Sequence, residues 1–87
     1  MAVLIRMSSE SMDVETYDKI TADLIPKLRS QPGFILHVAF ETADGIGVSE
    51  LWETREQHEA WSTDVEPHMP PGAERNYLEV HALVTPE

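Results

Sequence analysis

The sequence predicts a small α+β protein in which two helices cover one face of a four-stranded antiparallel sheet. Two observations carry this prediction. Apolar side chains alternate between strand-like and helix-like spacing along the chain, and the elements follow the order strand, helix, strand, strand, helix, strand. The 87 residues fit one domain, residues 1–87. A single core of this size is only marginally sufficient, so burial against a second copy would help, and we expect a homodimer.

The first half of the chain is predicted to form a strand, a helix and a second strand. Residues 2–7, AVLIRM, are mostly apolar at both odd and even positions, which is typical of a strand covered on both faces. Asp13 is a good helix N-cap, and apolar residues follow it at steps of three and four, as on one helix face. Pro26 predicts a kink or a break in this helix, because proline removes a backbone hydrogen bond. Residues 33–41 then alternate like a strand.

The second half is predicted to form a hairpin, a helix and a last strand. Residues 42–45, TADG, have the composition of a hairpin turn, and residues 46–53 return as the third strand. Thr54 and Gln57 form a capping box that opens the second helix. The last strand is expected over residues 76–84. This order is that of the ferredoxin-like plait, whose usual sheet order, fourth-first-third-second, places the first and third strands in the centre.

Strand alternation divides the sheet's side chains between two faces. We expect the helices to cover the face that carries Phe34, Leu36, Val38 and Phe40. The other face is then too apolar to be freely solvated and too polar for a dry core, because unpaired buried charges are costly. We therefore expect it to pack on a second copy around a partly wet cavity. Its members are Leu4, Arg6, Ile35, His37, Val48, Glu50, Trp52, Tyr77, Glu79, His81 and Leu83.

This second face carries the candidate chemistry. His37, Glu50 and Trp52 share it, because either favoured hairpin register places His37 opposite one of the other two. A histidine beside a carboxylate can remove a proton next to a carbonyl group. Arg6 is expected to neighbour Glu79 or His81, and Arg6 or His81 would stabilise the developing oxyanion. The expected catalytic residues are His37, Glu50, His81 and Arg6, and the expected substrate-binding residues are Trp52, Tyr77, Glu79, Val48 and Ile35.

Each of these histidines can instead be a cross-strand or interface hydrogen-bonding residue. The remaining aromatic and imidazole side chains receive structural interpretations. Tyr17 fits core packing and a hydrophobic staple with Met12, and Trp61 fits the inner stripe of the second helix. His58 and His68 are expected to be solvated or to line a lid.

The composition argues against several classes of function. The formal net charge of -10 would repel nucleic acid. The chain has no cysteine for disulfides or thiolate metal sites, no apolar run near the ~18 residues of a membrane helix, and no signal segment, so we expect a cytoplasmic protein.

No cofactor or metal is expected either. A metal bound by His37, His81 and Glu50 or Glu79 is disfavoured, because edge strands three spacings of ~4.8 Å apart separate the ligands too widely unless a partner subunit contributes.

Four short motifs accompany this order of elements: PGF at 32–34, SELWET at 49–54, EQHEAW at 56–61 and EVHALV at 79–84. Together they resemble the antibiotic biosynthesis monooxygenase-like members of the dimeric α/β-barrel superfamily over nearly the whole chain. The resemblance implies a homodimer packed sheet to sheet, with a ligand cavity. It also implies an activity among those of cofactor-free monooxygenases, lactone isomerases, polyketide cyclases and haem-degrading enzymes, although many members have no known activity.

One position departs from this family. Its monooxygenases carry an asparagine four residues before the strand tryptophan; Trp52 matches the tryptophan, but Val48 occupies the asparagine position. An amide that would polarise a substrate oxygen is therefore missing. We expect acid-base cyclisation or isomerisation of an aromatic or polyketide-like molecule. A cofactor-free monooxygenase and a non-catalytic ligand-binding or interaction module are the alternatives.

Overall fold

The computed structural model describes residues 2–9, 12–43, 45–65, 67 and 74–86. The elements are β1 (Val3–Ser9), α1 (Val14–Arg29), β2 (Phe34–Thr42), β3 (Gly45–Trp52), α2 (Arg55–Val65) and β4 (Glu74–Glu79), in the predicted order. The antiparallel sheet has the order β2-β3-β1-β4, which is the predicted order read from the other edge. Within the described ranges no helix is long and apolar enough to cross a membrane.

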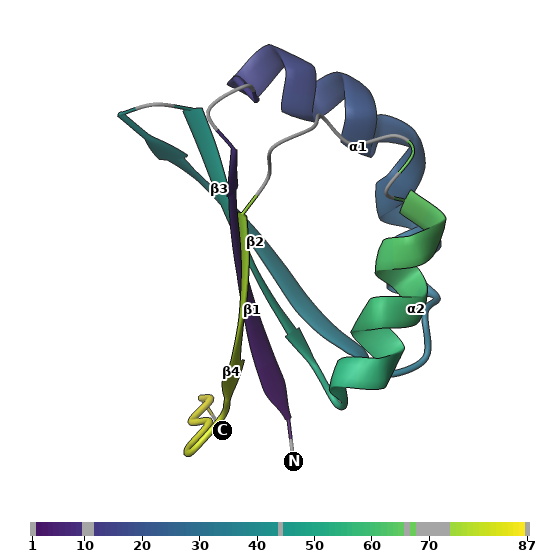
Figure 1. Ribbon diagram of the computed structural model, residues 1–87, viewed down its shortest axis with the longest axis vertical. Coiled ribbons are helices and arrows are strands. Elements are labelled where there is room, and N and C mark those ends of the chain that lie inside the picture. Colours follow the sequence, from purple (N-terminus) through teal and green to yellow (C-terminus); the bar gives the residue numbers. More distant parts are fainter. Residues whose placement is uncertain (1, 10–11, 44, 66, 68–73, 87) are drawn as a thin grey trace.

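Both helices lie on one side of the sheet (Figure 1). The backbone N–H of Thr16 donates to Asp13 Oδ1 over 2.8 Å, which confirms the predicted N-cap of α1. The backbone N–H of Gln57 likewise donates to Thr54 Oγ1 over 3.2 Å at the start of α2. α1 runs through Pro26 as one helix and curves along its length (Figure 1). Of the two predicted alternatives, a kink or a break, the break does not occur.

The helices cover the face opposite to the one predicted. Trp52 and Ile5, on the two central strands, are completely buried. They form one cluster with Leu28 of α1 and Trp61 of α2. The prediction chose the side from β2 alone, an edge strand, whereas the bulky side chains of the central strands determine which face is buried. The helix side carries Val3, Ile5, Met7, Phe34, His37, Ile46, Val48, Glu50, Trp52 and Tyr77.

A register shift at the start of β2 interrupts the predicted alternation. Phe34 pairs with Trp52, but Leu36 pairs with Leu51, so one extra residue lies between them. The shift places Phe34 on the helix side, where its ring meets the Trp52 ring edge-on at 5.5 Å. Ile35 and Leu36 are both exposed.

The side of the sheet away from the helices, called the open face below, exposes apolar side chains. Its exposed members include Leu36, Val38, Phe40 and Leu78. Leu51 at its centre is buried in the single chain and pairs with Leu4 and Leu36. The Phe40 ring lies so close to Gly47 that a Cβ on that glycine would come within 2.4 Å of it. This face, and not the predicted mixed face, is the one that the helices leave uncovered.

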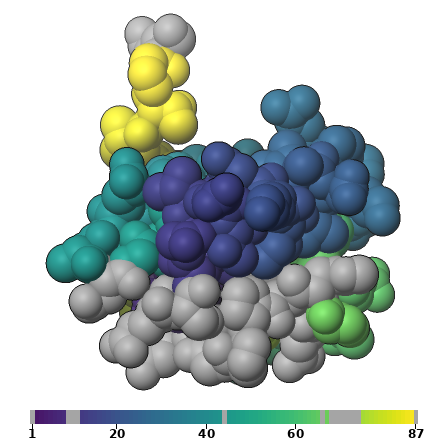
Figure 2. Space-filling model, turned by 90° about the horizontal axis from the view of Figure 1, so that it is seen from above, coloured from purple at the N-terminus to yellow at the C-terminus, as the bar shows by residue number. Residues whose placement is uncertain are grey.

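The last strand is shorter than predicted. β4 ends at Glu79 rather than Val84, and Val80 N–H still donates to Ala2 carbonyl oxygen over 3.1 Å. The following residues are exposed, His81 among them, and the C-terminal segment projects from the body of the molecule (Figure 2). The predicted loop at 68–74, including His68, lies outside the described residues except for residue 74.

Candidate active site

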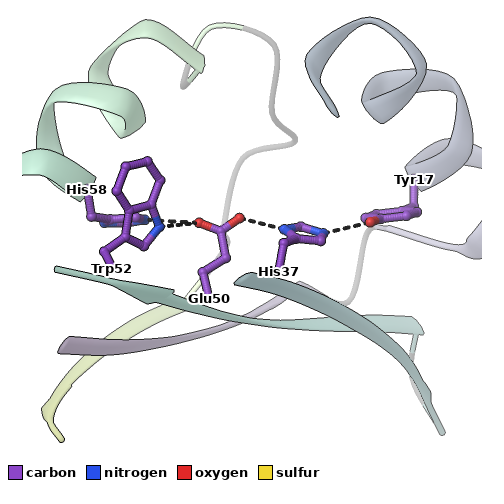
Figure 3. Close-up of polar contacts among 5 residues, drawn as sticks. All are labelled: Tyr17, His37, Glu50, Trp52 and His58. Atoms are coloured by element: carbon purple, nitrogen blue, oxygen red, sulfur yellow. Dashed lines mark hydrogen bonds and ion pairs between the residues drawn. The ribbon is translucent and has the colours of Figure 1, made fainter. Parts of the chain in front are cut away.

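Five side chains from four elements form a continuous series of polar contacts between the sheet and the helices (Figure 3). Tyr17 comes from α1, His37 from β2, Glu50 and Trp52 from β3, and His58 from α2. Their centre is the carboxylate of Glu50, which is 4 % exposed. A carboxylate this deeply buried requires donors on both oxygens, because an unpaired buried charge is strongly destabilising.

Each Glu50 oxygen has its own partners. Oε2 lies 2.6 Å from His37 Nδ1. Oε1 accepts the indole N–H of Trp52 over 2.9 Å and lies 3.7 Å from His58 Nε2. The pairing of β2 with β3 explains the short contact, since His37 is directly opposite Glu50. Residues opposite one another on adjacent strands share a face and lie close together.

His37 is engaged on both ring nitrogens. Its Nδ1 faces an acceptor that has no proton to give, so in the neutral ring Nδ1 carries the hydrogen and donates to Glu50. Nε2 is then the acceptor, and it receives the hydroxyl hydrogen of Tyr17 over 2.7 Å. The imidazole therefore presents its basic nitrogen to a phenol while the carboxylate holds its other side, an arrangement that orients a general base.

Tyr17 reaches this position from the inner side of α1. Its ring is nearly parallel to the His37 ring, at an interplanar angle of 20° with centroids 6.1 Å apart, and the hydroxyl points at the imidazole (Figure 3). Burial, with the negative charges of Glu50 and Asp18, raises the pKa of the Tyr17 phenol. The phenol is consequently protonated at neutral pH and serves as the donor to His37.

His58 joins the carboxylate from the opposite side. It is 2 % exposed, and its Nδ1 lies 3.0 Å from the hydroxyl of Tyr77 on β4. Burial lowers the pKa of His58, and the positive charge of Arg75 lowers it further, against the opposing effect of Glu50 and Glu59. His58 is therefore neutral at neutral pH.

The two ends of the network differ in accessibility. The side chain of His37 is 14 % exposed and Tyr17 is half-buried, whereas the side chains of Glu50 and His58 are 5 % and 2 % exposed. A small molecule therefore reaches the Tyr17–His37 end more readily than the Glu50–His58 end.

The structure brings together part of the predicted site. The prediction that His37, Glu50 and Trp52 share a face is confirmed by the pairing and the hydrogen bonds. Tyr77 lies on the same face and reaches the network through His58. The predicted role of Trp52 as a wall for substrate stays a prediction; its buried ring contacts Phe34 and His58. Val48 is partly buried on this face.

Of four other predicted residues, Arg6, Ile35 and His81 lie elsewhere, and Glu79, opposite Val3, lies on the helix side but is exposed. Arg6 is exposed on the open face, opposite Ser49 and Asn76, so its predicted pairing with Glu79 or His81 is wrong. The error lies in the register of β1 and β3: Ile5 is opposite Glu50 and shares its face, so Arg6 points to the other side. His81 lies beyond the end of β4, and Ile35, Glu79 and His81 are all exposed.

Sequence analysis missed the two side chains that extend the network, Tyr17 and His58. A signal for His58 was present: it precedes Trp61 and Ser62 by three and four residues, so the three lie on one buried stripe of α2. Tyr17 lies on the apolar stripe of α1, where core packing was a sufficient explanation for an aromatic ring. Among the described residues, no three His, Cys, Asp or Glu side chains are arranged to hold a metal ion.

Comparisons with known proteins agree with this architecture. No family model and no curated protein matches the chain. Among solved structures, a heme-degrading protein from Mycobacterium tuberculosis superposes with a TM-score of 0.73 at 22% identity, over 99% of this chain and 98% of that one. The cofactor-independent oxygenase SnoaB from Streptomyces nogalater superposes with a TM-score of 0.66 at 14% identity, over 95% and 94%.

A third solved structure is similar over a comparable length. A monooxygenase from Streptomyces coelicolor, in complex with the ligand nanaomycin D, superposes with a TM-score of 0.66 at 14% identity, over 99% of this chain and 92% of that one. The likeness extends over almost the full length of every chain. This chain therefore has the ferredoxin-like fold of the antibiotic biosynthesis monooxygenase-like proteins.

Proposed function

We propose that this chain is an acid-base enzyme that removes a proton from a small, largely apolar aromatic or polyketide-like molecule. The arrangement of His37 between Glu50 and Tyr17 carries the proposal, because it orients a basic nitrogen and stabilises the cation that the base becomes. The substrate class comes from the resemblance to the antibiotic biosynthesis monooxygenase-like proteins.

The hydrogen bonds define a proton path. The Tyr17 hydroxyl oxygen accepts the substrate proton while its own hydrogen passes to His37 Nε2. His37 becomes an imidazolium, and the Glu50 carboxylate 2.6 Å from Nδ1 stabilises that charge. Because the Tyr17 phenol has a raised pKa, it acts by passing its proton on to His37 rather than as a preformed phenolate.

Two reactions can follow this step. In cyclisation or isomerisation, the substrate carbanion or enolate attacks within the same molecule, or regains the proton at another atom. In cofactor-free oxygenation, dioxygen reacts with the anion, and an activated methylene becomes a carbonyl: R₂CH₂ + O₂ → R₂CO + H₂O. No external reductant is needed. SnoaB, a cofactor-independent oxygenase of the same fold, favours the second reaction, whereas Val48 in place of the family's asparagine counts against it.

The open face supports a homodimer as part of this proposal. Val38 and Leu78 are 50% and 47% exposed there, on opposite edge strands. Contiguous exposed apolar surface on a sheet is typical of a protein interface. The helix side, which holds the polar network, is then left free of the partner.

The experiment uses anthrone, an aromatic carbon acid, and hydroquinone as probes. Substrate loss and dioxygen consumption are followed together for the wild-type protein and for Tyr17→Phe and His37→Ala. Each variant is expected to lose ~10²–10⁴-fold in kcat, the usual contribution of general acid-base catalysis. Glu53→Gln is the control, because Glu53 is exposed and lies outside the network.

The outcomes separate the alternatives. One dioxygen consumed per anthrone identifies oxygenation, and substrate loss without dioxygen consumption identifies cyclisation or isomerisation. A third outcome is saturable binding of a probe without turnover, with the same affinity in Tyr17→Phe. This outcome would identify the chain as a ligand-binding module and contradict the proposed enzyme.

A further inference from the structure

The carboxylate of Glu50 is approached by two tyrosine-histidine pairs, one on each side. On one side Tyr17 contacts His37, whose Nδ1 is 2.6 Å from Oε2. On the other, Tyr77 contacts His58, whose Nε2 is 3.7 Å from Oε1. The histidines thus face the carboxylate through different ring nitrogens, and this difference fixes their tautomers.

Glu50 and Tyr77 together determine the tautomer of His58. The neutral His58 ring has one hydrogen, and its Nε2 faces the negatively charged Oε1, where a lone pair would be repelled. The hydrogen is therefore on Nε2, and Nδ1 accepts the Tyr77 hydroxyl hydrogen over 3.0 Å. His37 has the opposite tautomer, with its hydrogen on Nδ1.

The surroundings of His58 hold this ring in place. Its ring meets Trp52 and Tyr77 edge-on, with centroids 5.5 Å and 5.4 Å away. Trp52 is the residue that donates directly to Oε1, so the His58 ring also packs against the donor that fixes this oxygen. The guanidinium carbon of Arg55 lies 4.2 Å from the centroid of the Tyr77 ring, in a cation–π contact.

We propose that His58 is a positioning residue: in its Nε2–H tautomer, set by Glu50 and Tyr77 together, it fixes Oε1 of Glu50 so that Oε2 is kept on His37. The contact of 3.7 Å is longer than a hydrogen bond, so His58 acts through its N–H dipole and through its packing on Trp52. The catalytic consequence rests on the proposed function; the tautomers and the position of Glu50 do not.

The charges around His58 agree with this role. Glu50 on β3 and Glu59 on α2 favour a charged ring, whereas Arg75 on β4 and the burial itself oppose it. Because His58 is neutral, the Glu50 carboxylate can stabilise a protonated His37 without competition. A second imidazolium would compete for the same carboxylate.

The test is ¹⁵N-edited NMR of the imidazole rings in the intact protein, without substrate, at neutral pH. We expect His58 as the Nε2–H tautomer and His37 as the Nδ1–H tautomer, with a downfield resonance for the His37 Nδ1–H that faces Glu50.

Two matched variants separate the functions of the His58 ring. His58→Gln keeps a donor near the position of Nε2, whereas the shorter His58→Asn keeps its amide near Nδ1 and leaves no donor near Nε2. We expect the His37 resonance to persist in His58→Gln and to be lost in His58→Asn.

Tyr77→Phe keeps the ring under Arg55 and removes only the hydroxyl, so it tests the same proposal without a change in the core. We expect His58 to become a mixture of tautomers in this variant, with the Trp52 indole resonance as the check that the core is intact. Wild-type His58 with its hydrogen on Nδ1 would overturn the proposal. So would an unchanged His37 Nδ1–H resonance in both Tyr77→Phe and a folded His58→Asn. The expected spectra with no turnover of any probe would remove the proposed function and leave this assignment standing.

Discussion

Replacing Glu50 with glutamine tests the network with almost no change in shape. The Trp52 indole can only donate, so the glutamine carbonyl is held by Trp52 and the new NH₂ group faces His37 Nδ1. His37 must then accept at Nδ1 and carry its hydrogen on Nε2. In that tautomer His37 donates to the Tyr17 oxygen and can no longer take the Tyr17 proton.

The expected loss of activity is large and the expected loss of stability is small. A reversed tautomer in a base dyad lowers kcat by about 10⁴, and loss of a general base lowers it by ~10²–10⁴. Glu50→Gln replaces hydrogen bonds to a charged acceptor, worth about 1.5–3 kcal/mol each, with neutral ones of about 0.5–1.5 kcal/mol. It also removes the cost of burying a charge, so the free energy of unfolding should change by only about 1 kcal/mol.

Glu50→Ala separates catalysis from folding. It leaves the Trp52 indole N–H and the His37 Nδ1–H without an acceptor, at about 1–3 kcal/mol for each buried group. Urea unfolding should therefore show a loss of about 2–6 kcal/mol for alanine and little for glutamine, while both variants lose turnover of the probe that wild type converts. A glutamine variant with wild-type kcat would refute the reasoning from the His37 tautomer.

Three further predictions concern stability and assembly. Gly33→Ala should destabilise the fold by about 1–3 kcal/mol in urea unfolding, because Gly33 has φ +83° and the new Cβ would come within 2.0 Å of Gln57 Oε1; an unchanged midpoint would contradict this. Val38→Asp should convert a dimer to a monomer in light scattering with an unchanged circular dichroism spectrum, whereas a persisting dimer would remove the open face as the interface. His58 has a lowered pKa when folded, so the unfolded chain binds the proton more tightly, and stability falls as pH drops below about 6.5, by at most about 1.4 kcal/mol per pH unit. His58→Gln should lose less stability than wild type between pH 7 and 5, and equal losses would contradict the assignment.

The fold was predictable because its signals are local. The Asp13 cap, the Thr54 capping box and the TADG turn each act within a few residues, and the hairpin fixes which β2 and β3 side chains share a face. The shared face of His37 and Glu50 could therefore be predicted from sequence, whereas the prediction left open whether His37 is opposite Glu50 or Trp52. His37 and Glu50 lie on one hairpin, so no long-range information was needed.

The side of the sheet that the helices cover is a tertiary property, and here sequence analysis failed. Phe34 seemed to share a face with Leu36, but the register shift between them separates the two. Apolar side chains occur on both faces, so alternation alone does not choose between them. Burial of Trp52 in one cluster with Trp61 makes the choice, and this cluster joins β3 to a helix later in the chain.

The site residues that come from distant parts of the chain could not be predicted for the same reason. His58 and Tyr77 meet only because α2 packs across the sheet towards β4. His81 was placed in the site by assuming that β4 continues to Val84, whereas it ends at Glu79. Arg6 was placed there because the register of β1 against β3, which puts Ile5 opposite Glu50, was not known. Residue types alone do not show at which residue an edge strand ends.

Proton abstraction by the Tyr17–His37–Glu50 series is the central claim, and hydrogen-deuterium exchange of the probe tests it most directly. Anthrone is incubated anaerobically in D₂O with wild-type protein or Glu50→Gln, and exchange of its methylene hydrogens is followed by NMR. Because dioxygen is absent, the rate reports deprotonation alone, whichever reaction follows. The proposed series predicts faster exchange with wild type than with buffer, and exchange near the buffer rate with Glu50→Gln. Equal acceleration by wild type and Glu50→Gln would contradict it.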